Sequence, residues 1–304
     1  MFSDVCSYSA QCVFPARACL GESPQWWPDR NLLIWVDIEQ SKVGLFDPIS
    51  KVNRFVDVGA HVGCAVPTDK GNLLCATSDG FYFLDPDSTQ IIPLHNPEAS
   101  LPNNRFNDGK CDPWGQFWVG SLSYDFMPNG GNLWRFNSSL QSTLILDSVT
   151  ISNGLAWSLD YKHLFYIDSP TLQVKRFSLS KSGDLVDDGE VCIQIPADWG
   201  CVPDGMTIDS KGMLWIALWN GSAVTRWDPS TGKHLSTVSV PCPRVTSCCF
   251  GGPRLDVLYI TTASDSLSDG SDSLYELAGG IFAAHVDVSG RPEHKFFECQ
   301  DSSS

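Results

Sequence analysis

The chain has 304 residues, 42% of them hydrophobic, so it is long enough to bury a large core. Asp and Glu outnumber Lys and Arg by 35 to 20, which gives a formal net charge of -15. A surface of that sign repels nucleic acid and acidic lipid. No run approaches the ~18 apolar residues of a membrane span, and the first twenty residues lack the basic and apolar regions of a signal peptide. We therefore expect a cytoplasmic protein with neither nucleic acid nor membrane as a partner.

The twelve cysteines are scattered through apolar segments and include no Cys-x-x-Cys pair. In a chain of this length they are expected to be small buried hydrophobes rather than a disulfide framework. Cys248 and Cys249 are adjacent within a predicted strand, so their side chains should point to opposite faces of it.

In chain order, six short apolar and aromatic-rich runs recur at intervals of roughly 40 to 50 residues, each preceded by turn-forming residues, which have the form Asp-x-x-Gly or Pro-Asp in three of the six. We predict them as strands over residues 32–36, 73–76, 117–120, 164–167, 214–217 and 258–261. Each unit also has a polar-tipped strand before this run and a third strand after it. No stretch shows a sustained helical period.

This repeat predicts an all-β chain folded as a six-bladed β-propeller, because a small sheet of this kind cannot bury both faces without neighbours. The alternative is a β-sandwich with coincidental spacing. We expect one domain over residues 1–304, structured over about 12–298, with a flexible tail at 299–304. Propellers usually close the ring with strands from both termini, so residues 11–14 are expected to pair beside residues 294–297.

Four polar side chains stand at a similar position in four of the units, roughly a dozen residues before the aromatic one: Glu22, Asn107, Asn153 and Asp204. In a propeller the innermost strand of each blade lines the central channel, so these four side chains should converge on one axis. Two carboxylates and two amides offer oxygen ligands, which suit a hard divalent cation such as Ca²⁺, Mg²⁺ or Mn²⁺. Taken singly, Asn153-Gly154 and Asp204-Gly205 are also ordinary turn dipeptides, so a role in turns alone stays open.

The same positions carry a family resemblance. The motifs are Gly-Glu-Ser-Pro at 21–24, Asn-Asn-Arg-Phe-Asn-Asp-Gly at 103–109, Ser-Asn-Gly-Leu at 152–155 and Pro-Asp-Gly-Met at 203–206. In this order, and over nearly the whole chain, they resemble the regucalcin and gluconolactonase (senescence marker protein) family of sugar lactone hydrolases. The resemblance implies a six-bladed propeller that holds one divalent metal ion (Ca, Zn, Mn, Mg or Fe) and hydrolyses sugar-acid lactones.

Matched motif by motif, the resemblance implies that Glu22, Asn153 and Asp204 bind the metal. Asp204 would also serve as the general base for the attacking water, a role that requires hydrogen-bond reach.

The substrate contacts implied by the family are Arg105 and Asn107, with Asn107 close enough to act as a fourth or water-bridged ligand. Family members have a glutamate a few residues after the third aromatic strand, where this chain has Tyr124-Asp125. Asp125 is one methylene shorter, so its contact with a sugar hydroxyl, and the choice among glucono-, xylono- and arabinonolactone, stay open.

Other functions remain as alternatives to a lactonase acting as a monomer or weak homodimer on a small sugar lactone. The chain could be a calcium-binding regulatory protein of regucalcin type, an interaction platform, or a hydrolase of organophosphate esters. Four tryptophans are candidates either for stacking on a sugar or for core packing: Trp26, Trp27, Trp199 and Trp219. His61 is expected at the pocket wall. The segment from Asp265 to Glu276 only partly matches a calcium loop and is read as a surface loop.

Overall fold

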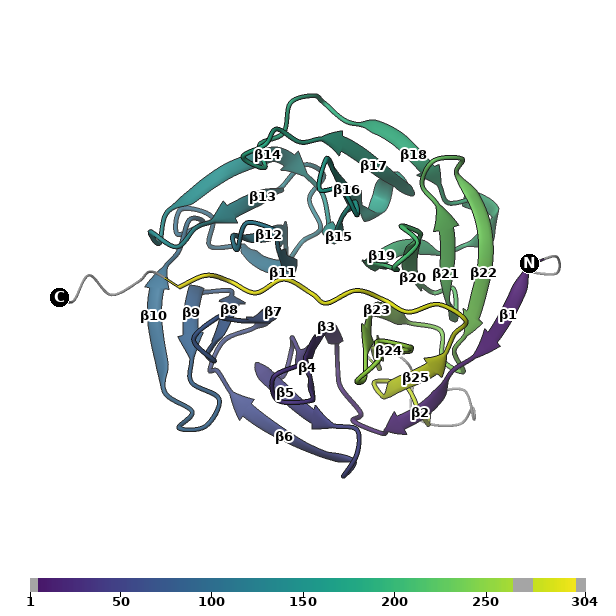
Figure 1. The fold of residues 1–304 in the computed structure, drawn as a ribbon. Helices are drawn as coiled ribbons and strands as arrows, with labels where there is room; N and C mark the ends of the chain where they lie inside the picture. The colour runs from purple at the N-terminus through teal and green to yellow at the C-terminus, as the bar shows by residue number, and fades with distance from the viewer. Residues whose placement is uncertain (1–4, 265–275, 299–304) are drawn as a thin grey trace.

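The computed structural model describes residues 5–264 and 276–298, which form a ring of six β-sheets around a central channel (Figure 1). The predicted six-bladed β-propeller is confirmed. The only helical turns in the described ranges are two short 3₁₀ segments, η1 (Ser169–Thr171) and η2 (Ala197–Trp199). None of the described helices has the length and apolar character needed to cross a membrane. The predicted tail at 299–304 and the loop beginning at Asp265 lie outside the described residues.

The consecutive strands of each blade pair antiparallel, and the first of these consecutive strands lies nearest the channel. Residues Cys6–Ser9, at the outer edge of the fifth blade, pair in parallel with their neighbour. The first three blades, in chain order, are β3 (Gly21–Trp27), β4 (Leu32–Asp37), β5 (Lys42–Asp47) and β6 (Val52–Asp57); β7 (Val62–Pro67), β8 (Leu73–Thr77), β9 (Gly80–Leu84) and β10 (Ile91–His95); and β11 (Asn104–Cys111), β12 (Phe117–Ser123), β13 (Gly131–Phe136) and β14 (Ser142–Val149).

The other three blades contain the remaining strands. They are β15 (Ser152–Trp157), β16 (His163–Asp168), β17 (Gln173–Ser178) and β18 (Glu190–Gln194); β19 (Val202–Ile208), β20 (Leu214–Trp219), β21 (Ala223–Asp228) and β22 (Lys233–Ser239) with β1 (Cys6–Ser9); and β23 (Val245–Gly251), β24 (Val257–Thr262) and β25 (Ile281–His285) with β2 (Gln11–Phe14). The six predicted aromatic runs are the second strands of the blades, as expected, and their aromatic residues fill the core between blades. Cys248 packs with Trp215 and Cys249 with Trp26, which confirms that these two cysteines face opposite sides of β23.

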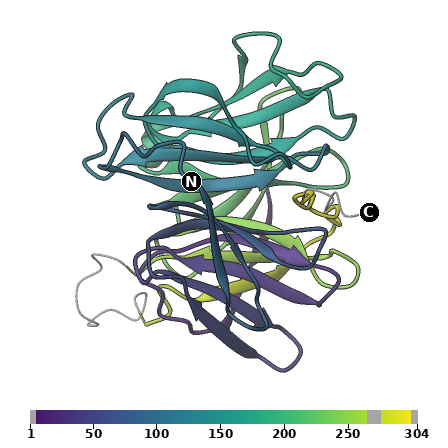
Figure 2. The same cartoon turned by 90° about the vertical axis from the view of Figure 1, so that its left-hand side faces the viewer.

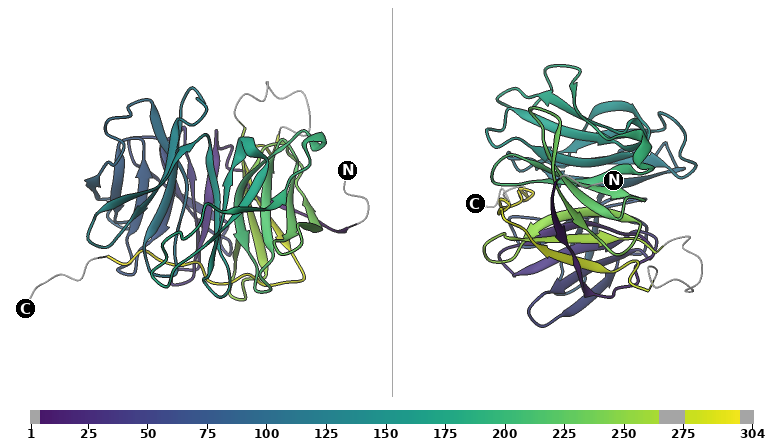
Figure 3. Two further views of the ribbon diagram at one scale, coloured as in Figure 1. Left: turned by 90° about the horizontal axis from the view of Figure 1, so that it is seen from above. Right: turned by 90° about the vertical axis from the view of Figure 1, so that its right-hand side faces the viewer.

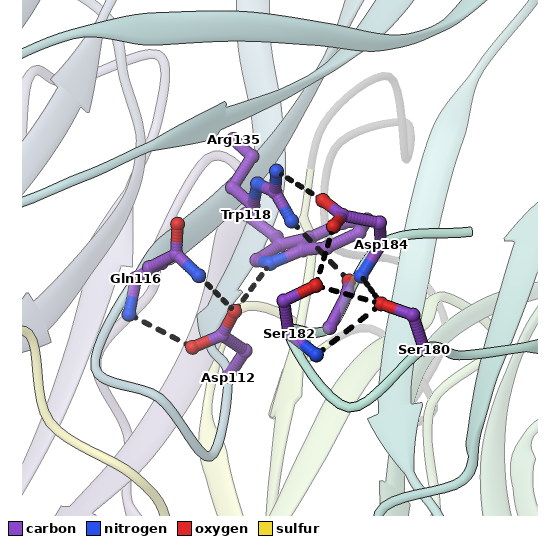
Figure 4. A network of polar contacts seen from close by, with 8 residues as sticks. Asp112, Gln116, Trp118, Arg135, Ser180, Ser182 and Asp184 are labelled. Atoms are coloured by element: carbon purple, nitrogen blue, oxygen red, sulfur yellow. Dashed lines mark hydrogen bonds and ion pairs between the residues drawn. The ribbon is translucent and has the colours of Figure 1, made fainter.

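The Asp-x-x-Gly turn signal has a structural explanation (Figure 4). After β11, one Asp112 oxygen accepts hydrogen bonds from the backbone N–H groups of Trp114 and Gln116, and the other accepts one from the Trp118 indole at 2.8 Å. Asp209 caps the turn after β19 in the same way and accepts a bond from the Trp215 indole at 3.0 Å. The aspartate therefore fixes both the turn and the aromatic side chain that follows it.

Every innermost strand has a β-bulge. The register shifts lie at residues 22–25 in β3, 62–64 in β7, 106–109 in β11, 152–155 in β15, 203–206 in β19 and 245–247 in β23. A bulge adds a residue to one strand and re-aims its side chains. Four of the six bulges contain a candidate site residue, namely Glu22, Asn107, Asn153 or Asp204.

The predicted ring closure was wrong about its partner. Residues 11–14 do form a strand, but this strand, β2, pairs with β25 and completes the last blade. Residues 286–298, here called the strap, instead cross one face of the ring (Figures 1 and 3). The strap bridges Asp209 through Gly290 and Thr68 through Phe296. An extended segment with apolar residues has the same sequence pattern whether or not it joins a sheet, so this pattern does not separate a closing strand from the strap.

The strap covers the end of the channel at which the innermost strands finish, because its bridges are to Thr68 and Asp209, the residues that follow β7 and β19. Figure 2 shows the strap end-on, at one face of the ring. Its Glu293 accepts a hydrogen bond from the buried Lys110 ammonium at 3.2 Å. Phe296 is fully buried and stacks on Phe136, with ring centroids 5.7 Å apart. The opposite end of the channel, where these strands begin, holds the candidate site.

Candidate functional site

A pocket of about 250 Å³ opens at the channel end away from the strap. Five of the six predicted site residues line it: Glu22, Arg105, Asn107, Asn153 and Asp204. They come from β3, β11, β15 and β19, near the beginning of each strand. The convergence expected from their common position in the repeat is therefore observed.

The local backbone of the first strand aims Glu22 into this pocket. Ser23, the next residue, has a φ of 48°, in the left-handed region that non-glycine residues seldom adopt. Its N–H donates a hydrogen bond to Glu22 Oε2 at 2.7 Å. The bulge in β3 thus holds the carboxylate in place at some cost in backbone strain.

A chain of hydrogen bonds connects the other polar groups. Arg105 donates to Asn107 Oδ1 at 2.7 Å, and the Asn107 amide donates to Ser152 O at 2.8 Å and to Asn153 Oδ1 at 3.4 Å. The Asn153 amide donates to Ser169 Oγ at 2.9 Å. These bonds orient both asparagine side chains. Because the Asn153 amide nitrogen is directed at Ser169, its carbonyl oxygen points away from Ser169 and can accept further contacts.

The two buried carboxylates of the pocket, Glu22 and Asp204, resist ionisation in the protein alone. Burial raises the pKa of Glu22 well above its ordinary value, and the charges of Asp204 and Asp108 raise it further. Burial also raises the pKa of Asp204, reinforced by Asp108 and opposed by the hydrogen bond from Asn153 and the charge of Arg105. Two acids buried close together in this way are stabilised when a cation joins them.

The donor set fits a divalent cation with oxygen ligands. Within residues 5–264 and 276–298, no group of three His, Cys, Asp or Glu side chains is placed to hold a metal. A cation here would need the Asn153 amide oxygen besides the Glu22 and Asp204 carboxylates. All three side chains are buried, and such a mixture of carboxylate and carbonyl oxygens is one that hard cations accept.

Asp125 is the one predicted site residue that does not line the pocket. Its carboxylate accepts a hydrogen bond from the Asn103 side chain at 2.7 Å. The next residue, Phe126, lines the pocket instead. The predicted contact of Asp125 with substrate remains a prediction.

His61 forms a hydrogen bond with the Tyr124 hydroxyl at 2.8 Å, and neither of them lines the pocket. Of the four tryptophans considered, Trp219 lines the pocket, whereas Trp26 and Trp27 are buried in the core.

Sequence reasoning missed several lining residues. Ser169 lies in η1, directly after the second strand of its blade, and Glu39 follows β4, where no motif marks either of them. The apolar residues Leu20, Ile151 and Val202 each stand two positions before a predicted ligand. Those three could have been predicted, because residues two apart in a strand face the same side.

Below the pocket lies a second layer of buried charge. Burial raises the pKa of Asp108 to about 6, opposed by the charge of Lys110 and by the N–H of Gly109. Asp108 Oδ1 accepts that N–H at 2.8 Å, and Oδ2 has no hydrogen-bond partner among the described residues. This layer connects the pocket to Glu293 of the strap through Lys110.

The chain is similar to several known proteins over most of its length. A family model described as "SMP-30/Gluconolactonase/LRE-like region" matches residues 20–264. A putative sugar lactone lactonase, YvrE, of Bacillus subtilis is 36% identical over 274 residues, covering 90% of this chain and 94% of its own. Regucalcin of Danio rerio is 38% identical over 293 residues, covering 95% and 99%.

Solved structures show the same fold. A luciferin-regenerating enzyme superposes with a TM-score of 0.89 at 28% identity, covering 95% of this chain and 99% of its own. A calcium-binding protein, regucalcin, from Agrobacterium tumefaciens superposes with a TM-score of 0.91 at 24% identity, covering 96% and 98%. With the family model and the relatives above, the chain belongs to the SMP-30/gluconolactonase/LRE-like family.

Proposed function

We propose that this protein hydrolyses sugar-acid lactones with the help of one divalent cation held by Glu22, Asn153 and Asp204. The observation that carries the proposal is the meeting of two buried carboxylates, an oriented amide and an arginine in one open pocket. The relative named as a putative sugar lactone lactonase and the gluconolactonase family model support the same reaction class. Gluconolactone, xylonolactone and arabinonolactone are the candidate substrates.

A lactone is an activated ester, and a bound divalent cation would supply Lewis-acid polarisation of its carbonyl and make a nearby water more acidic. Asp204 accepts the proton of that water as its oxygen adds to the carbonyl carbon. Arg105 donates hydrogen bonds to the developing oxyanion or to sugar hydroxyls, and Asn107 holds the Arg105 guanidinium in position. The ring C–O bond then breaks, and the product is the open hydroxy acid.

The direct test is to follow acid release from purified aldonolactones with and without a chelator. We expect cation-dependent turnover well above the spontaneous rate. If no aldonolactone is hydrolysed faster in the presence of any of Ca²⁺, Mg²⁺, Mn²⁺, Zn²⁺ or Fe²⁺, the proposed function is wrong.

Asp204→Ala should reduce turnover by at least about 10²-fold, because it removes both a ligand and the proton acceptor. The measurement is kcat for gluconolactone at saturating cation. Asp188→Ala is the matched control, since Asp188 is an exposed carboxylate that does not line the pocket, and this variant should keep full activity. An active Asp204→Ala enzyme would remove Asp204 from the mechanism.

A second candidate function is calcium-binding regulation without important turnover. It is favoured by the name of one structural relative, a calcium-binding protein, and by the oxygen-only donor set. Calorimetry separates the two candidates: sub-micromolar Ca²⁺ affinity together with inert lactones would favour regulation. We also expect a monomer or weak homodimer in the cytoplasm, which sedimentation velocity and cell fractionation would test.

A further inference from the structure

The pocket has an apolar layer above its polar floor. Leu20, Ile151 and Val202 each lie two residues before a floor residue, and all three line the pocket. Residues two apart in an extended strand share a face and are separated by about 6 to 7 Å. This layer therefore lies one step nearer the mouth than Glu22 and its companions.

Three further apolar side chains complete the layer: Leu122, Phe126 and Trp219. Trp219 is held in place by a backbone bridge to Arg244 and by the Arg244 guanidinium, 4.9 Å from the centre of its ring. Leu122 is bridged to Ile151 across neighbouring blades. The apolar layer is thus built by contacts between blades.

A strained backbone places Phe126 in the apolar layer. Its φ of 51° lies in the left-handed region, which is costly for a bulky residue. The Phe126 N–H donates to Ser123 O at 2.8 Å, which closes the turn. The side chain is 59% exposed although it is large and apolar.

The same turn keeps the Asp125 carboxylate out of the apolar layer. Asp125 is drawn to Asn103, so the residue that lines the pocket at this point is a phenyl ring rather than a carboxylate. Strain that keeps an apolar side chain at a pocket mouth is typical of a site that contacts ligand. Outside the floor, the charged group of the lining is the exposed Glu39 carboxylate, which accepts a hydrogen bond from the Cys19 thiol at 2.9 Å. A fully hydroxylated substrate would therefore have few partners at the level of the apolar layer.

We propose that the protein also hydrolyses lactones that carry an alkyl or aryl substituent on the ring, with the substituent packed against Phe126, Trp219 and the layer around them. This inference rests on the proposed function, since the ester group would occupy the same floor. It adds a substrate class to the sugar lactones.

The reaction is the same hydrolysis. Water oxygen adds to the carbonyl carbon, its proton passes to Asp204, and the bond between that carbon and the ring oxygen breaks. The ring oxygen takes up a proton and becomes the hydroxyl of a substituted hydroxy acid. The alkyl or aryl group takes no part in the bond changes and contributes only binding energy, which is expressed in kcat/KM.

The test is a homologous series of δ-lactones: δ-valerolactone, δ-hexalactone, δ-octalactone and δ-decalactone, with gluconolactone measured in parallel. We expect kcat/KM to rise roughly fourfold for each methylene that the pocket fully buries. A flat or falling series alongside good turnover of gluconolactone would overturn this inference and leave the proposed function intact. Failure of every lactone, sugar lactones included, would overturn both.

Phe126→Ala should flatten the dependence of kcat/KM on chain length. Met127→Ala is the matched control, because Met127 is the adjacent exposed apolar residue and does not line the pocket; the dependence should persist in that variant. If Phe126→Ala retains the full slope while Trp219→Ala retains it as well, the apolar layer does not bind the substituent and the inference is wrong.

A binding measurement gives a readout independent of turnover. Alkyl δ-lactams have the shape of the δ-lactones and resist hydrolysis, so calorimetry can report their affinity for the intact protein. Affinity should increase with chain length for the unmodified protein and for Met127→Ala, and stay nearly constant for Phe126→Ala. Equal affinity of short and long lactams for the unmodified protein would contradict the proposal.

Discussion

At the scale of single residues, the most unusual group is the Asp108 carboxylate. It lies inside the channel, with one oxygen bonded to the Gly109 N–H and the other without a hydrogen-bond partner in the described part of the chain. Its raised pKa, about 6, means that burial outweighs the nearby Lys110 ammonium. A carboxyl group protonated more easily in the folded than in the unfolded protein stabilises the fold at low pH and loses that contribution as the pH rises.

We therefore expect Asp108→Asn to become more stable relative to the unmodified protein as the pH rises from about 4 to about 6. The folded protein binds more protons than the unfolded chain in that window, and asparagine removes this dependence. The rise in the Asp108 pKa from its ordinary value to about 6 corresponds to roughly 2 to 3 kcal/mol in the free energy of unfolding. Urea denaturation in chelator at about pH 4 and pH 7 measures the difference. A difference independent of pH would show that Asp108 does not titrate in this range.

The motifs located the proposed metal ligands but not the direction of the neighbouring Asp125 side chain. Glu22, Asn153 and Asp204 were identified by their common position in the repeat, and the structure brings all three to one pocket. The direction of Asp125 depends on a hydrogen bond to Asn103 and on the strained turn at Phe126. A motif does not specify such a turn, because many residues reach the left-handed region only when the surrounding structure holds them there.

At the scale of strands, the site depends on how closely the innermost strands approach. A Cβ atom added at Gly154 would lie 2.6 Å from Met206 Cβ and 2.8 Å from Asp204 O. Gly205 is equally tight, with an added Cβ 2.0 Å from Ser247 Oγ. The glycines that follow Asn153 and Asp204 therefore allow neighbouring blades to touch, and this contact sets the distance between the two proposed ligands.

We expect Gly154→Ala to push β15 away from β19, lowering kcat/KM for lactones by more than tenfold and destabilising the protein by about 1 to 3 kcal/mol. Lactone turnover and urea denaturation report the two effects. Gly59→Asn is the control, because an added Cβ at Gly59 meets nothing within 4 Å and asparagine tolerates its φ of 78°. Wild-type behaviour of Gly154→Ala would mean that the blades can separate without disturbing the site.

At the scale of the whole molecule, two segments from the chain ends hold the ring together. β2 completes the last blade, and the strap crosses the channel end opposite the pocket. The strap is anchored by the Lys110–Glu293 pair and by Phe296, which sits among aromatic rings of two blades. A buried ion pair is weak evidence for stability, so the aromatic anchor should carry most of the docking energy.

Phe296→Ala should therefore destabilise the protein by about 3 to 5 kcal/mol, the usual cost of emptying a buried phenylalanine site. The neighbouring Phe297→Ala is the matched control; its side chain is 49% exposed, so its loss should be clearly smaller. Chemical denaturation compares the two. Equal effects would indicate that the strap is not anchored at Phe296.

The blades, their number and the position of the polar residues within them could all be predicted from the amino-acid sequence. These features arise from local rules: an aspartate that caps a turn and orients the next tryptophan, the two-residue period of a strand, and a repeat that recurs at nearly equal intervals. Three other features became visible in the folded protein: the pairing of β2 with β25, the strap formed by residues 286–298, and the position of Phe126 rather than Asp125 at the pocket. Each of these depends on which distant segments come into contact, and the free energy of such contacts is not encoded in any short stretch of the chain.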